Sequence, residues 1–176
     1  AAYPVIGLHI GKLVGSAVPV IVGAPAGLSE DRLKAIGSAG ASSGSLAMFH
    51  VVGSTPEAPD LETACGGRVP TDRHVITAAD LRTARDQLTT STNAKLGAIS
   101  LGTPHYSVPE FARLIELLGD RRIHPDSHAY VNTGRSVAHE LDLRGWSTQL
   151  ADAGVQLVTD TCTYITPVMA DVHGTA

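Results

Sequence analysis

Four polar segments hold the side chains of this sequence best suited to acid–base, anion-binding or metal chemistry. They are residues 53–57, 102–107, 132–136 and 160–162, and each follows a short apolar run. The carboxyl ends of parallel strands form the ligand crevice of an open sheet. The four segments are therefore predicted to converge on one pocket.

His105 and Ser107 are the candidate catalytic residues of the second segment. His105 lies in a predicted loop where no apolar face requires it, so it suits proton transfer, although an ordinary surface histidine is the simpler alternative. Ser107 and Glu110 have the spacing of a capping box, which by itself would explain the serine as the N-cap of a helix.

Substrate-binding candidates lie in the first and third segments. Thr55 and Glu57 flank Pro56, a pattern that also fits a helix cap with proline in the first turn. Thr133 and Arg135 follow a predicted strand. Arg135 stands near an expected helix start, and the positive end of a helix repels a cation. Either a bound anion or a salt bridge must therefore compensate for this repulsion, and we favour the anion.

Cys65 and Cys162 are the only cysteines, too few for a disulfide framework, which favours a cytoplasmic protein. Cys162 comes directly after a predicted strand, in a polar setting that favours metal ligation or reactivity over the usual inert role. Cys65 has no partner at metal-ligand spacing.

Short β-branched runs alternate with helical spacing, which predicts an α/β fold with a mostly parallel sheet flanked by helices, in a single domain over residues 1–176. About five strands are expected, at 18–22, 46–52, 98–101, 128–131 and 155–159. Helices are expected around 7–16, near residue 30, after Thr77 and after Ser107.

Composition narrows the range of partners. The 176 residues carry a net charge of −4, with 43% hydrophobic and 17% charged residues, typical of a globular domain. The only adjacent basic pair among the arginines is 121–122, which argues against nucleic acid. The apolar runs are too short to span a membrane. The chain starts without Met, so we expect a piece of a longer polypeptide.

Several stretches resemble motifs of the aconitase X family of dehydratases, which includes cis-3-hydroxy-L-proline dehydratase and mevalonate 5-phosphate dehydratase. The matching stretches are GKLVG at 11–15, HVVGSTPEA at 50–58, ISLGTPHYS at 99–107 and VTDTC at 158–162. The resemblance implies an aconitase-like domain and the central part of the family's large subunit or domain.

By this resemblance, the activity is elimination of water from a small hydroxy acid, such as cis-3-hydroxy-L-proline or a phosphorylated hydroxy acid. The family uses iron or an iron–sulfur cluster, with Cys162 as the matching ligand, and a swivelling small domain or subunit that supplies a catalytic serine. His105, Ser107, Thr55 and Glu57 would line the substrate side. Two cysteines cannot supply a three-cysteine cluster, so other ligands would lie outside this chain. The alternative is an inactive α/β scaffold or binding domain.

Overall fold

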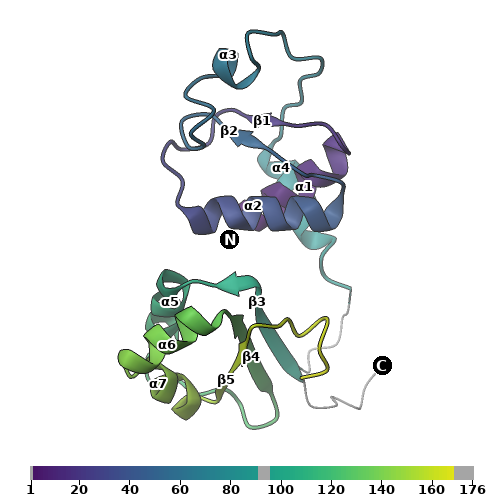
Figure 1. The fold of residues 1–176 in the computed structure, drawn as a ribbon. Helices are drawn as coiled ribbons and strands as arrows, with labels where there is room; N and C mark the ends of the chain where they lie inside the picture. Colours follow the sequence, from purple (N-terminus) through teal and green to yellow (C-terminus); the bar gives the residue numbers. More distant parts are fainter. Residues whose placement is uncertain (1, 91–95, 169–176) are drawn as a thin grey trace. The chain divides into compact units, whose positions relative to one another are not determined.

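The computed structural model describes residues 2–90 and 96–168. The chain divides into two compact units, Ala1–Thr92 and Asn93–Ala176, where the sequence analysis expected one domain (Figure 1). Each unit contains its own parallel sheet and its own apolar cluster.

The unit Ala1–Thr92 pairs a small sheet with helices. Its elements are α1 (Ala2–Val14), β1 (Val20–Ile21), α2 (Glu30–Ser43), β2 (His50–Val51), α3 (Leu61–Ala64) and α4 (Ala78–Asp86). Strands β1 and β2 are parallel, and Val51 packs with Leu28 and Ile36 in the core of this unit.

Two glycines let α1 and α2 approach closely. A Cβ on Gly7 would lie 2.2 Å from the carbonyl oxygen of Ile36, and one on Gly11 would lie 2.3 Å from that of Gly40. Gly7 and Gly11 are four residues apart and therefore lie on the same face of α1. Gly15 instead follows the end of α1 with φ +59°.

The unit Asn93–Ala176 contains a three-stranded parallel sheet in the order β3-β4-β5. Its elements are β3 (Ala98–Tyr106), α5 (Val108–Leu118), β4 (His128–Thr133), α6 (Arg135–Leu143), α7 (Trp146–Asp152) and β5 (Val155–Thr159). The three helices cover one face, and the segment after β5, yellow in Figure 1, runs along the other.

Alternation along β4 assigns its side chains to the two faces. Ala129 and Val131 belong to the core cluster beneath the helices, together with Phe111, Leu141 and Leu150. His128, Tyr130 and Asn132 therefore point to the helix-free face. Tyr130 and Asn132 are nevertheless buried.

The predicted α/β class and the parallel strands are confirmed, but the strands form two sheets instead of one. Period-two patterning identifies a strand without identifying its neighbour, because pairing depends on residues distant in the chain. Helices α3 and α7 were not predicted.

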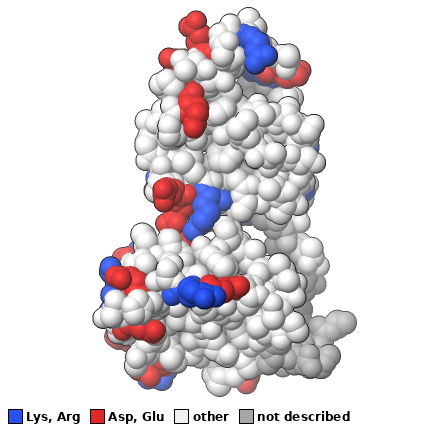
Figure 2. All heavy atoms as spheres, viewed as in Figure 1, with Lys and Arg blue, Asp and Glu red and all other residues white. Residues whose placement is uncertain are grey.

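Charged side chains pair locally in both units. Lys34 bonds Asp31 one helical turn away, and Arg144 bonds Glu140 in the same manner. On the face shown in Figure 2, basic and acidic side chains lie next to one another, without a large patch of one sign. None of the helices in the described ranges is long and apolar enough to cross a membrane.

Candidate functional site

A bulge in β3 presents the candidate residues at the carboxyl end of the three-stranded sheet. Pairing with β4 is regular up to Leu101 opposite Val131, and it resumes at Tyr106 opposite Thr133. Four residues of β3, 102–105, thus stand opposite a single residue of β4. Such bulges redirect side chains near functional sites.

Two side chains of β4 anchor the ends of this bulge. Asn132 Nδ2 donates to the carbonyl oxygen of Leu101 at 2.8 Å, and Thr133 Oγ1 donates to that of Tyr106 at 2.8 Å. Both side chains are fully buried. They replace ladder bonds that the bulge interrupts. The structure therefore gives Thr133 a place beneath the bulge, and its predicted contact with substrate stays a prediction.

His105 connects the bulge to the segment after β5. Its Nε2 lies 3.0 Å from the carbonyl oxygen of Thr161. Because a carbonyl oxygen only accepts, the His105 Nε2–H is the donor in this contact. The residue is exposed, as a group that transfers protons to a ligand must be.

Cys162 lies against the same bulge. Its Sγ is 3.2 Å from Thr103 Oγ1, and the backbone N–H of Tyr164 donates to Sγ at 3.5 Å. The Thr103 hydroxyl, followed by the N–H groups of Tyr164 and Ile165, lowers the pKa of the thiol, with burial opposing. The thiolate is the form that binds metals and acts as a nucleophile, so these contacts favour both roles.

Arg135 forms a salt bridge with Asp160. The sequence had favoured a bound anion at this position, with a salt bridge as the alternative. The backbone N–H of Arg135 donates to Asp160 Oδ1 at 2.8 Å, and its Nε donates to Asp160 Oδ2. The carboxylate thus occupies the amino end of α6. The guanidinium side chain remains 84% exposed, and its role toward substrate stays a prediction.

Asp160 lies in one of the four polar segments, but its pairing with Arg135 was not predicted from the sequence. It has φ +58°, a left-handed conformation that Asp tolerates better than most residues. No sequence spacing links it to a helix that starts 25 residues earlier. The backbone N–H of Arg135, then its side chain, lower the pKa of the Asp160 carboxyl, and His105 acts in the same direction whenever its ring is protonated.

This lowered pKa predicts acid-dependent stability. A carboxyl with a depressed folded-state pKa stabilises the fold above its unfolded-state pKa, about 4, and that contribution is lost as the pH falls through the folded value. We expect Asp160→Asn to lower the urea midpoint at pH 7 and to converge with the parent as the pH is lowered from 4 toward 2. Asp142→Asn, which changes an exposed carboxylate of α6, is the control. A difference that is constant across this range would contradict the prediction.

Ser107 caps α5, as its spacing predicted. Its hydroxyl accepts from the N–H of Glu110 at 3.3 Å, and Glu110 Oε2 accepts from the N–H of Ser107 at 3.0 Å. Pro109 follows in the first turn. The cap accounts for a serine at this position, and the proposed catalytic role stays a prediction.

Thr55 and Glu57 belong to the unit Ala1–Thr92, so the described site joins three of the four polar segments. Thr55 does not cap a helix, contrary to its pattern. Its Oγ1 accepts from the N–H of Val51 at 3.1 Å and closes a turn, whereas Asp60 caps the next helix, α3. Glu57 is exposed in that turn. Local turn bonds after β2 compete successfully with helix initiation here.

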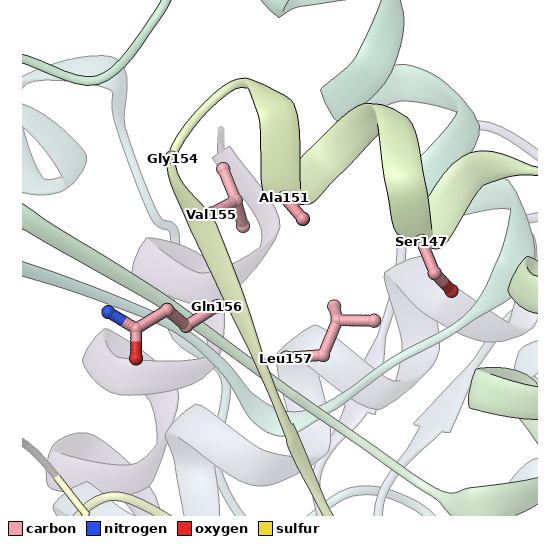
Figure 3. Close-up of a pocket in the computed structure, with 6 residues that line it drawn as sticks. All are labelled: Ser147, Ala151, Gly154, Val155, Gln156 and Leu157. Carbon is pink, nitrogen blue, oxygen red and sulfur yellow. The ribbon is translucent and has the colours of Figure 1, made fainter.

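A shallow hollow of about 500 Å³ lies at the opposite end of β5 from these residues. It is lined by Ser147 and Ala151 of α7 and by residues 154–157, with the Leu157 and Gln156 side chains on opposite sides of the strand (Figure 3). None of the candidate side chains contributes to it.

The candidate residues of this unit supply one suitable ligand for a metal ion, Cys162. Cys162 offers a thiol whose pKa is lowered by the Thr103 hydroxyl, but the described residues contain no group of three or more His, Cys, Asp or Glu placed to hold a metal ion. Cys65 ends α3 in the other unit. A complete site would take its other ligands from outside the described residues.

Comparison with known proteins matches both units to one family. Residues 1–86 match the model of the aconitase X second domain, and residues 96–175 match that of the third domain. The division between the two matches falls near the division between the two compact units.

Individual relatives agree with these matches. Cis-3-hydroxy-L-proline dehydratase of Pseudomonas aeruginosa is 39% identical over 92% of this chain, and the large subunit of phosphomevalonate dehydratase of Methanothermobacter thermautotrophicus is 34% identical over 94%. The chain spans 28% and 40% of their respective lengths. The crystal structure of Thermococcus kodakaraensis aconitase X in its holo form superposes with a TM-score of 0.77 at 26% identity, covering 91% of this chain and 40% of that one.

Proposed function

Because this chain belongs to the aconitase X family, we propose that it forms part of a hydro-lyase that eliminates water from a small hydroxy acid. The observation that carries the proposal is the convergence of His105, Thr103 and Cys162 at the β3 bulge, joined by two hydrogen bonds to the segment after β5. A group able to transfer protons and a thiol with a lowered pKa thus occur together at the carboxyl end of this sheet.

Cys162 is proposed as one ligand of iron or of an iron–sulfur cluster, the other ligands coming from the rest of a longer polypeptide. The bound metal would supply a Lewis acid for the departing hydroxyl, since expelling hydroxide at neutral pH needs a Lewis or a general acid. Thr103 would donate to the Cys162 thiolate and keep it deprotonated.

His105 is proposed to act at the neighbouring carbon. With Nε2–H donated to the carbonyl oxygen of Thr161, the lone pair of Nδ1 accepts the proton from that carbon. The electrons of the broken C–H bond form the double bond, and the hydroxyl leaves with its bonding pair. The Thr161 contact fixes the orientation and tautomer of the ring throughout this step.

The substrate is proposed to be a small anionic hydroxy acid, either cis-3-hydroxy-L-proline or a phosphorylated hydroxy acid. The exposed guanidinium of Arg135 supports an anionic group, because it retains N–H donors beyond the Nε bonded to Asp160. Ser107 and Thr133 belong to the same proposed set of site residues, and Thr55 and Glu57 of the other unit are each proposed to contact the substrate. A small swivelling domain or subunit and a cytoplasmic location are part of the same proposal.

An activity assay with metal analysis tests this function. The longer polypeptide, expressed with its small domain or subunit and purified without oxygen, is expected to retain iron and to dehydrate one of the two acids. Product is followed by chromatography for each acid separately. Iron-free protein with neither activity would reject the proposal and favour the scaffold alternative. Iron with activity toward one acid would identify the substrate.

A further inference from the structure

We propose that Thr163 and Asn132 are positioning residues that hold Cys162 against Thr103, an inference that rests on the proposed role of Cys162. Cys162 and Thr103 come from segments 59 residues apart, and both are on the surface side of the site. Their 3.2 Å contact requires something beneath it to fix the segment after β5 on the sheet.

Thr163 forms that connection on the helix-free face. It is buried, with its Oγ1 2.6 Å from Ser100 Oγ on β3 and 3.5 Å from Asn132 Nδ2 on β4. The residue next to Cys162 is therefore bonded to the two strands that bear the bulge. Tyr164 and Ile165, which follow, are largely exposed and give the segment little burial.

Asn132 links this contact to the bulge itself. The same Nδ2 that approaches Thr163 donates to the carbonyl oxygen of Leu101, where regular pairing stops. The side-chain amide nitrogen of Asn132 thus contacts both Thr163 and the start of the bulge. Displacement of either changes the position of Cys162 relative to Thr103.

The amide oxygen of Asn132 has a position that a contribution to stability does not explain. Asn132 Oδ1 is buried and, within the described residues, accepts no hydrogen bond. A buried acceptor without a partner destabilises a fold, and native structures contain few of them. An asparagine at this position is therefore better explained by its contacts with Thr163 and Leu101 than by stability.

The test uses Thr163→Val, which removes the hydroxyl and keeps the shape, because changing fully buried Asn132 risks unfolding the sheet. All variants carry Cys65→Ser, so that Cys162 is the only thiol. The iron-free chain is alkylated with iodoacetamide at pH 7, and the second-order rate constant is measured by intact mass. Thr163→Val is expected to lower it about 3- to 10-fold, because the Cys162 sulfur moves away from the Thr103 hydroxyl and loses that one hydrogen bond.

Three further variants separate positioning from a general structural effect. Thr163→Ser restores the hydroxyl and should return the rate to within about twofold of the parent. Thr159→Val makes the same change at an exposed residue of β5 and should leave the rate unchanged. Thr103→Val should slow the reaction, and adding Thr163→Val to it should slow it no further, because both act through one contact.

A folded Thr163→Val chain that reacts at the parent rate or faster would overturn the inference. Independent, additive effects of Thr103→Val and Thr163→Val would also overturn it. Circular dichroism and the urea midpoint establish that each variant is folded. Because no iron is present, these rates are independent of metal binding, so a failed iron assay would reject the proposed function without altering them.

Discussion

Replacing Cys162 with serine is expected to remove iron from the longer polypeptide and to reduce dehydration by about 100-fold or more. Serine has nearly the same shape, so the segment after β5 keeps its Thr163 anchor. Its hydroxyl stays protonated at neutral pH, however, and a neutral hydroxyl is a poor substitute for a soft thiolate ligand. Iron content after anaerobic purification and the dehydration rate are the two measurements.

Cys65→Ser provides a matched control for this substitution. It changes the same atom at a half-buried position that ends α3, in the unit without the bulge. We expect it to leave iron content and rate at the parent values. Unchanged iron in Cys162→Ser, or equal losses in both variants, would contradict the assignment of Cys162.

Gly102→Ala is expected to have the largest effect on the stability of the sheet unit. Gly102 has φ +89°, and a Cβ built there lies 2.2 Å from the carbonyl oxygen and 2.7 Å from the nitrogen of Asn132. These are backbone atoms of the central strand, which cannot move without breaking pairs on both sides. Backbone strain and the clash together predict a loss of roughly 2–5 kcal/mol in unfolding free energy.

Trp146 makes this effect measurable in one unit. It is the only tryptophan of the chain, and it packs on the core cluster of the three-stranded unit. Its fluorescence during urea denaturation therefore reports on that unit. Gly145→Ala is the control, because Gly145 also has positive φ, +71°, but nothing within 4 Å of its Cβ position. It should cost only about 1 kcal/mol. Equal losses of unfolding free energy in Gly102→Ala and Gly145→Ala would show that the contact with β4 is not decisive.

Local hydrogen bonding explains which features were predictable from sequence. The capping box of Ser107 and Glu110 joins residues three apart, and a second box joins Thr77 and Asp80. Strand β5 also has the predicted bounds, 155–159. In each case the decisive contacts or patterns lie within one short stretch, so residue types and spacing suffice.

The segment after β2 shows where local patterns fail. Thr55 and the proline after it have the sequence of a helix start, yet the threonine hydroxyl closes a turn on Val51 and the helix begins only at Leu61. Two local structures were compatible with the same residues. Residue types and spacing alone do not distinguish these two structures.

By itself, the sequence determined the α/β class, the start of α4 after Thr77, the cap of α5, and the polar segments that follow the strands. Only the tertiary structure decided that the strands form two sheets, that Asp160 occupies the start of α6, and that Thr163 and Asn132 lie beneath Cys162. These contacts join residues 25 to 59 positions apart in the chain. Spacing along the chain fixes which residues can meet within a helix or a turn, whereas contacts at such separations depend on strand order and register.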